Sequence, residues 1–197
     1  DGVLGILGAS GCGKSMTLKC IAGIERPDSG HIELDGVTLF DSEKRINLPP
    51  QKRHVGYLFQ NYALFPNMTV RQNILCGLRA EKRSRAQSEQ ALHEVMELLG
   101  LTGLERRLPS QLSGGQQQRT ALARILISQP KLLMLDEPFS ALDTHLREKL
   151  QIEMKHLLRS YQGATLMVTH SRDEAYRLCD RIALMKTGRN LTLQPTK

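Results

Sequence analysis

One short segment constrains the fold of this chain more than any other. Residues 8–15 read GASGCGKS, which fits the pattern G-x-x-x-x-G-K-[ST]. The apolar run Val3–Leu7 predicts a buried strand before it, and Lys14–Ile24 predicts a helix after it. Glycines let such a loop curl so that backbone N–H groups converge on phosphate oxygens, and the helix N-terminus adds positive potential. The segment therefore predicts a phosphate-binding loop in an α/β protein.

Residue types within this loop indicate distinct roles toward a bound phosphate group. Lys14 is predicted to reach the terminal phosphates of a nucleotide, and the Ser15 hydroxyl is predicted to ligate Mg²⁺. The predicted nucleotide-binding residues are Gly8, Ala9, Ser10, Gly11, Cys12, Gly13, Lys14, Ser15 and Met16.

A second apolar run ends in two acidic residues. Leu132–Leu135 predicts a buried strand, and Asp136 and Glu137 follow it directly. Because ligands of parallel α/β sheets bind at the carboxyl ends of the strands, we expect both acids beside the phosphate loop. Asp136 is predicted to hold Mg²⁺, and Glu137 to polarise an attacking water as general base. Alone, an Asp-Glu pair after a strand is weak evidence, since acids often cap helices.

The remaining pattern alternates short apolar runs with helical stretches, which is typical of a parallel α/β sheet. Asp35-Gly36 between two short strand-like runs predicts a hairpin. From about Thr69 to Ser128 the pattern is helical, and its apolar stripe at residues 91–99 indicates packing. We expect one domain over residues 1–197, with an α/β core (1–60 and 129–197), a small antiparallel β element and an inserted helical subdomain (61–128). Because the chain begins with Asp1, we expect it to be truncated at both ends.

The helical stretch contains a second candidate anion site. Leu112 is followed by Ser113, Gly114, Gly115 and Gln116, which open a helix. Ser113 and Gln116 have the spacing of a capping box, so they could simply cap their own helix. The two glycines favour a further role, because they would expose N–H groups to an incoming anion.

Six motifs in order make the chain resemble the nucleotide-binding subunits of ABC transporters over its whole length. They are the phosphate loop, Gln60, LSGGQ at 112–116, LLMLDE at 132–137, Ser140-Ala141-Leu142-Asp143, and His170. The resemblance implies a P-loop NTPase (RecA-like) core that binds and hydrolyses ATP with Mg²⁺. It also implies a head-to-tail pair, in which the signature of one copy covers the ATP of a second copy.

The same resemblance implies roles for residues that spacing alone does not explain. Gln60 would sense Mg²⁺ and the γ-phosphate, His170 would contact the γ-phosphate and orient the water, and Asp143 would bridge the two copies. The segment from Asn61 to Pro66 would contact the membrane permease subunits; packing in the core is the alternative for its Leu64 and Phe65.

Composition excludes several classes of protein. No run of eighteen apolar residues is present, so we expect no membrane span. The four cysteines are scattered and suit neither a zinc site nor a disulfide framework. The formal net charge of +7 is spread along the chain, which favours a solvated basic surface over a nucleic-acid site.

Together these observations predict an ATPase subunit of an ABC importer, peripheral at the cytoplasmic face of the membrane. The stretch from Asp41 to Arg53 is similar to molybdate importer ATPases, so molybdate or a related oxyanion is the predicted solute. The main alternative is a nucleic-acid-associated ATPase of the same type, which the net charge favours slightly. A regulatory module that binds ATP without hydrolysis is a further alternative, which Glu137 and His170 disfavour.

Overall fold

The computed structural model describes residues 2–78, 83–140, 142 and 144–196, and these form two compact units. The first unit contains the residues up to 57, residues 131–137 and those from 155 onward. The second contains 58–130 and 138–154, so it includes a segment, 138–154, that the sequence analysis assigned to the core. In the described part of the chain, no helix is both long enough and apolar enough to span a bilayer.

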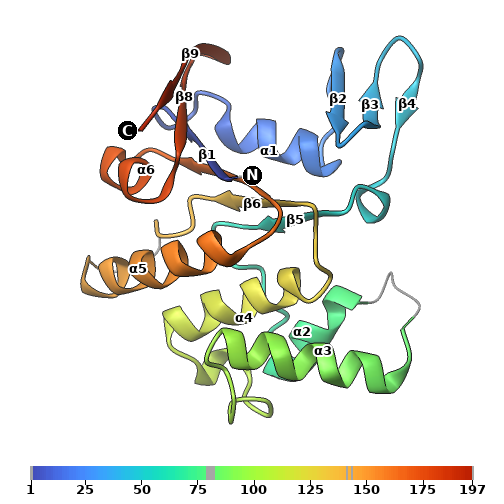
Figure 1. The fold of residues 1–197 in the computed structure, drawn as a ribbon, viewed down its shortest axis with the longest axis vertical. Helices are drawn as coiled ribbons and strands as arrows, with labels where there is room; N and C mark the ends of the chain where they lie inside the picture. The colour runs from blue at the N-terminus through green and yellow to red at the C-terminus, as the bar shows by residue number, and fades with distance from the viewer. Residues whose placement is uncertain (1, 79–82, 141, 143, 197) are drawn as a thin grey trace. The chain divides into compact units, whose positions relative to one another are not determined.

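Among the described residues, the first unit is built around a six-stranded sheet (Figure 1). Its order is β5 (Val55–Leu58), β6 (Leu132–Asp136), β7 (Ala164–Thr169), β1 (Gly2–Leu7), β8 (Arg181–Lys186) and β9 (Arg189–Pro195). Strand β1 is parallel to both β7 and β8, and β6 is parallel to β7. This confirms the α/β fold with a parallel sheet. Strand β9 pairs antiparallel with β8 at the edge of the sheet.

The strand register brings three strand ends to one edge. Leu7 of β1 pairs with Thr169 of β7, and Asp136 of β6 pairs with Val168 of β7. Because these strands are parallel, the residues that follow them leave the sheet on the same side. The phosphate loop follows β1, Glu137 follows β6 and His170 follows β7, so this edge gathers the predicted catalytic residues of the first unit.

Helix α1 (Lys14–Ala22) packs on the sheet beneath this edge. Leu18 and Ala22, one turn apart, are buried against Ile6, Met134 and Val168 from three different strands. The helix ends at Gly23, whose φ of 78° is left-handed and closes the last turn with bonds to Cys20 O and Lys19 O. It is therefore shorter by two residues than the predicted Lys14–Ile24.

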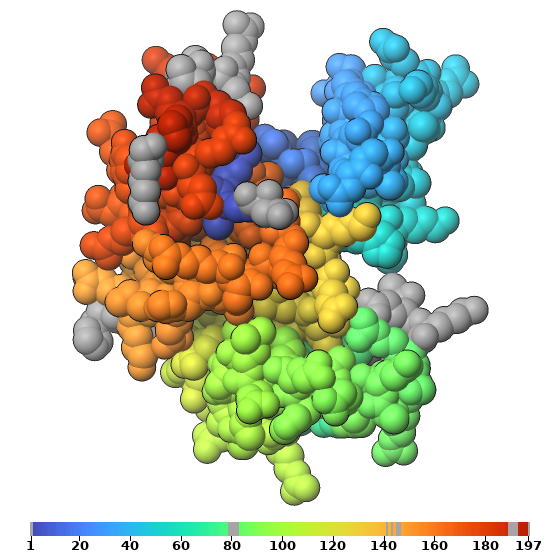
Figure 2. All heavy atoms as spheres, in the orientation of Figure 1, coloured from blue at the N-terminus to red at the C-terminus, as the bar shows by residue number. Residues whose placement is uncertain are grey.

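A small antiparallel sheet follows α1 and forms a lobe of its own in Figure 2. It consists of β2 (His31–Leu34), β3 (Val37–Asp41) and β4 (Ile46–Asn47), and the predicted hairpin at Asp35-Gly36 joins the first two. A short 3₁₀ turn, η1 (Pro50–Lys52), comes next and leads to Arg53.

Arg53 connects this lobe to α1 through hydrogen bonds. The residue is almost completely buried, with 1% of it exposed. Its Nη1 donates to the carbonyls of Cys20 and Ile21 at 2.8 and 2.9 Å, and its Nε donates to Leu48 O at 2.7 Å. Its Nη2 donates to Asn47 Oδ1 at 2.7 Å. The last carbonyls of a helix have no intrahelical partner, so the guanidinium satisfies two of them while it fixes the loop after β4.

Two further helices lie in the C-terminal part of the chain, α5 (Thr144–Ser160) and α6 (Arg172–Leu178). Helix α6 packs against β1 and β7 through its buried Ala175 and Leu178. It begins two residues after His170, so its first turn fixes the segment that carries this side chain.

The second unit is helical where it is described, as the sequence predicted. Its main helices are α2 (Val70–Leu75), α3 (Arg85–Leu98) and α4 (Gly114–Leu126), with short 3₁₀ turns η2 (Cys76–Leu78) and η3 (Pro109–Gln111). The three helices pack on one another, and a Cβ at Gly77 would lie 2.0 Å from Arg124 O. The predicted apolar stripe is buried at Leu92, Val95, Met96 and Leu99, but it was wrong at Leu98, which is 60% exposed at the end of α3.

Candidate nucleotide-binding and hydrolysis site

The phosphate loop connects β1 to α1 and depends on two of its glycines. Gly13 caps α1 with a φ of 104°, a conformation that side chains other than glycine rarely adopt. A Cβ at Gly8 would lie 2.4 Å from Met185 O of β8, so the loop could not pass there with any larger residue. Ala9, Ser10 and Gly11 between them are exposed, which leaves the outer face of the loop open to a ligand.

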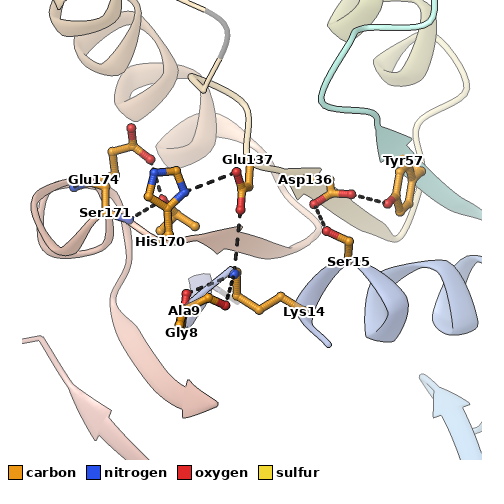
Figure 3. A network of polar contacts seen from close by, with 11 residues as sticks. Gly8, Ala9, Lys14, Ser15, Tyr57, Asp136, Glu137, His170, Ser171 and Glu174 are labelled. Carbon is orange, nitrogen blue, oxygen red and sulfur yellow. Dashed lines mark hydrogen bonds and ion pairs between the residues drawn. The ribbon is translucent and has the colours of Figure 1, made fainter. Parts of the chain in front are cut away.

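Lys14 is held inside the loop, with 4% of the residue exposed. Its Nζ donates to Gly8 O and Ala9 O, each at 3.0 Å, and lies 3.7 Å from Glu137 Oε1 (Figure 3). The ammonium group therefore already sits within the loop, among acceptors that a phosphate oxygen could replace.

Glu137 lies between Lys14 and His170. Its Oε2 is 3.2 Å from His170 Nδ1, its side chain is 16% exposed and the imidazole is 53% exposed (Figure 3). Its backbone has a φ of 45°, which is uncommon for a residue other than glycine, and its N–H donates to Val168 O at 3.1 Å. The chain thus turns sharply at the end of β6, and that turn directs the carboxylate toward the other two residues.

Asp136, one residue earlier, is 6% exposed and accepts two hydrogen bonds from hydroxyl groups. Ser15 Oγ donates to Oδ1 at 2.7 Å, and the Tyr57 hydroxyl donates to Oδ2 at 2.6 Å (Figure 3). Burial of Tyr57, with the hydrogen bond to Asp136 and its negative charge, raises the pKa of the phenol far above its usual range. Tyr57 is therefore protonated at neutral pH and acts as the donor.

The residues around Ser15 fit a magnesium ion. A serine hydroxyl and a carboxylate are oxygen ligands of the kind Mg²⁺ prefers, and such sites take few protein ligands because phosphates and waters supply the rest. No group of three or more His, Cys, Asp or Glu side chains suited to a metal occurs among the described residues. The predicted Mg²⁺ ligands Ser15 and Asp136 are hydrogen-bonded to each other, so the two side chains are neighbours.

A buried pair fixes the segment that carries His170. Thr169 Oγ1 donates to Glu174 Oε2 at 2.6 Å and accepts the Ser171 N–H at 3.0 Å. The Ser171 side chain caps α6 by accepting the Glu174 N–H at 3.3 Å. Ser171 and Glu174 have the spacing of a capping box, but only half of it forms, because the Glu174 carboxylate accepts from Thr169 instead.

The remaining predicted site residues lie in the first unit, in the second unit or outside the described residues. Gln60, predicted as a catalytic and Mg²⁺ residue, follows β5 in an exposed turn. Asp143 lies outside the described residues. In the first unit, Cys12 is partly exposed and Met16 is 52% exposed.

The signature residues cap α4. Ser113 Oγ accepts the Gln116 N–H at 3.3 Å, and Gln116 Oε1 accepts the Ser113 N–H at 2.9 Å. This reciprocal pair is the capping box that the spacing predicted. It leaves the N–H groups of Gly114 and Gly115 at the first helical positions, where a helix provides them with no partner of its own.

Residues 61–66, the predicted permease contact, are held from behind by Arg124 and Asn73. Arg124 donates to Ala63 O at 2.7 Å and Tyr62 O at 2.9 Å, and its guanidinium lies 5.5 Å from the centre of the Phe65 ring. Asn73, fully buried, accepts the Phe65 N–H at 2.9 Å and donates to Phe65 O. Phe65 itself is 45% exposed, so packing in the core does not account for this ring.

Sequence reasoning missed three residues of the first site: Tyr57, Thr169 and Glu174. Tyr57 could have been noticed as a hydroxyl-bearing aromatic in the short strand next to Gln60. Thr169 and Glu174 lie close to His170 in the sequence, but the spacing of Ser171 and Glu174 indicated a helix cap, and nothing indicated a contact between Thr169 and Glu174.

The fold and this edge define the class of the protein, a P-loop nucleotide-binding domain: a mainly parallel sheet with a glycine-rich loop after β1 and two acids at the end of β6. The sequence model described as ABC transporter matches residues 1–140, and the chain belongs to this family.

Curated relatives agree with this family assignment. The chain is 46% identical over 191 residues to the Fe(3+) ions import ATP-binding protein FbpC of Haemophilus influenzae, covering 97% of this chain and 54% of that protein. It is 46% identical over 186 residues to the spermidine/putrescine import ATP-binding protein PotA of Lawsonia intracellularis, covering 94% and 49%. It is 48% identical over 184 residues to the sulfate/thiosulfate import ATP-binding protein CysA 2 of Chromobacterium violaceum, covering 93% and 48%. The chain thus spans about half the length of these relatives.

Two solved structures share the fold over the whole chain. One is an ATP-binding cassette in a dimeric post-hydrolysis state bound to ADP and Pi, with a TM-score of 0.79, 28% identity and 86% of that chain covered. The other is CbiO1 from Clostridium perfringens, part of the ABC transporter complex CbiONQ, with a TM-score of 0.85, 29% identity and 78% covered.

Proposed function

We propose that this chain binds and hydrolyses ATP and that the hydrolysis drives a membrane importer. The observation that carries the proposal is the edge where Lys14, Glu137 and His170 meet, with Ser15 and Asp136 in contact beside them. These groups match the needs of phosphoryl transfer, in which catalysis consists mainly of positioning and charge neutralisation.

Each residue at this edge has a distinct part in the reaction. The loop N–H groups and the α1 N-terminus bind the phosphates, and Lys14 exchanges its loop carbonyls for phosphate oxygens. Ser15 and Asp136 would hold Mg²⁺, with Gln60 as the further predicted ligand, and the ion would neutralise phosphate charge. Glu137 orients the attacking water and accepts its proton. His170 holds the Glu137 carboxylate in place and is predicted to contact the γ-phosphate.

The signature supports pairing of two copies of the chain. With the capping box closed, the free helix N-terminus of α4 offers the N–H groups of Gly114 and Gly115 to an anion. We infer that in a head-to-tail dimer Ser113, Gly114, Gly115 and Gln116 contact the ATP bound by the second copy, with Asp143 coupling the two sites. The helical subdomain predicted at 61–128 would then act as the signature subdomain. One structural relative is itself described as dimeric.

Residues 61–66 are the proposed contact for a membrane permease. The exposed Phe65 ring, backed by Arg124, and the short segment around it suit a groove for a helix of the permease. This would place the chain peripherally at the cytoplasmic face of the membrane. CbiO1, one of its structural relatives, is part of a transporter complex.

The relatives' names bear on the transported solute. The three relatives import iron, polyamines and sulfate or thiosulfate by their names, so none of them names molybdate. One of them, CysA 2, does name an oxyanion, and molybdate or a related oxyanion stays a prediction. The nucleic-acid alternative rests on the net charge alone, and these relatives disfavour it.

The test is ATP turnover by the Glu137→Gln variant beside the wild-type chain. Glutamine keeps the size of the side chain but cannot accept a proton, so turnover should fall by about 10²–10⁴-fold while ATP binding is retained. Glu94→Gln, on the exposed face of α3, is the matched control and should turn over ATP normally. Equal turnover by the Glu137→Gln variant and the wild type would refute the assigned base.

A further inference from the structure

Tyr57 is a residue of the site that neither the motifs nor the proposed reaction includes, and it contacts the predicted Mg²⁺ ligand Asp136 directly. It lies on β5, next to β6 in the sheet, and its hydroxyl donates to Asp136 Oδ2 at 2.6 Å. Ser15 donates to the other oxygen, Oδ1, at 2.7 Å (Figure 3). Both carboxylate oxygens are therefore held by hydroxyl groups, one from the phosphate loop and one from a neighbouring strand.

The ring of Tyr57 is itself anchored. It packs against the core cluster formed by the sheet and α1, which includes Leu18, Ala22 and Met134. A tyrosine side chain has two torsion angles, χ1 and χ2. Packing of the Tyr57 ring restricts both, so the position of its hydroxyl group is restricted as well. Tyr57 thus connects the Asp136 carboxylate to the packed core of the first unit.

The contact leaves the carboxylate able to serve as a ligand. Each carboxylate oxygen has two acceptor sites, and each uses one in the bonds to Ser15 and Tyr57. If Ser15 served as a metal ligand, its bond to Oδ1 would be released, and the bond from Tyr57 would be the one that keeps the orientation of Asp136. Without it, the carboxylate could rotate at the moment when its position matters.

We infer that Tyr57 is a positioning residue that holds Asp136 in the orientation required for Mg²⁺, and that it thereby raises the affinity of the chain for Mg²⁺–nucleotide. This inference rests on the proposed ATP-binding function. It concerns binding of the metal-nucleotide complex and does not require Tyr57 to touch the reacting atoms.

The experiment is a Mg²⁺ titration of binding of a fluorescent ATP analogue to the wild type, Tyr57→Phe and Tyr161→Phe. Phenylalanine keeps the packed ring and removes the hydroxyl alone; Tyr161 is a partly buried tyrosine outside the site and serves as the matched control. We expect Tyr57→Phe to need about tenfold more Mg²⁺ for half-saturation, as for loss of one hydrogen bond to a charged group. Its affinity for the analogue in EDTA should equal that of the wild type.

Three results would overturn the inference. An unchanged Mg²⁺ half-saturation in Tyr57→Phe shows that the hydroxyl does not position Asp136. Equal losses of affinity with and without Mg²⁺, or a thermal unfolding midpoint lowered together with affinity in EDTA, show a general structural role. Absence of Mg²⁺-dependent binding in the wild type itself overturns the proposed function and the inference with it, so the two failures are told apart by the wild-type curve.

Discussion

The two units place their functional groups in contrasting ways. In the first, side chains far apart in sequence bind one another: Ser15 and Tyr57 hold Asp136, while Lys14 and His170 lie against Glu137. In the second, the signature side chains of Ser113 and Gln116 bind each other within one helical turn. The strand ends thus form a site with its own acid–base groups, whereas a helix cap only presents N–H groups and needs a ligand brought from elsewhere.

The largest effect is expected for the Lys14→Met variant. It removes the ammonium group that the loop holds for the phosphates, so affinity for Mg²⁺–ATP should fall by about a hundredfold. The measurement is equilibrium binding of a fluorescent ATP analogue. Lys19→Met, on the same helix but outside the site, is the control and should bind normally. Near-normal affinity of Lys14→Met would mean that the first unit does not form the phosphate site.

The next test asks whether the bonds that support the His170 segment affect stability and turnover without changing nucleotide affinity. Thr169→Val keeps the shape of the side chain but leaves the Glu174 carboxylate, 6% exposed, without its hydroxyl donor. The free energy of unfolding should fall by about 1–3 kcal/mol, and ATP turnover should fall while nucleotide affinity is retained. Thr165→Val, equally buried on the same strand, is the control for chemical denaturation. A Thr169→Val variant as stable as the control variant would contradict this reading.

A smaller effect compares two equivalent caps in the second unit. Ser113 and Ser84 each close a full capping box, at α4 and α3. Replacing either with alanine should lower the free energy of unfolding by about 1 kcal/mol. ATP turnover should fall in Ser113→Ala alone, because the signature is proposed to face a nucleotide and the α3 cap is not. Equal turnover in the two variants would mean that the signature residues act only as a helix cap.

The smallest effect concerns a polar cluster of the first unit that lies in the small sheet. Backbone N–H donation from Lys44, with further bonds from His31 and the Glu43 N–H, holds the pKa of Asp41 below its ordinary value. A carboxyl whose folded pKa is lowered stabilises the fold above its unfolded pKa, and this contribution is lost as pH falls through the folded pKa.

Asp41→Asn should therefore be less stable than the wild type at neutral pH, and the difference should shrink below about pH 4. Denaturation at several pH values measures it, with the exposed Asp28→Asn as control. A difference in stability that grew in acid would contradict the lowered pKa of Asp41. A loss of ATP affinity in Asp41→Asn would mean that this cluster and the nucleotide edge are not independent.

The sequence predicted those parts of the fold that have local signatures. The phosphate loop, the hairpin at Asp35-Gly36, the helical insert and most of the strands follow from glycine spacing and apolar periodicity. The end of α1 was misplaced because Ile24 continues the apolar pattern, whereas Gly23 in the left-handed conformation ends the helix.

Contacts between distant strands could not be predicted. Tyr57 and Asp136 are separated by 79 positions and meet only because β5 and β6 are neighbours in the sheet. No local pattern indicates that Arg53 is buried; it is buried because carbonyls from α1 and the loop after β4 converge on it. The roles of Gln60 and Asp143 came from family resemblance and stay predictions.

The most direct test of the paired mechanism is the rate of ATP hydrolysis per molecule as a function of protein concentration, with Glu137→Gln as the inactive reference. If the signature of one copy completes the site of another, the rate per molecule rises with concentration until the pairs saturate, and Glu137→Gln shows none. A rate per molecule that stays constant over a hundredfold range that includes monomeric chains would contradict the account, because the first unit would then hydrolyse ATP alone.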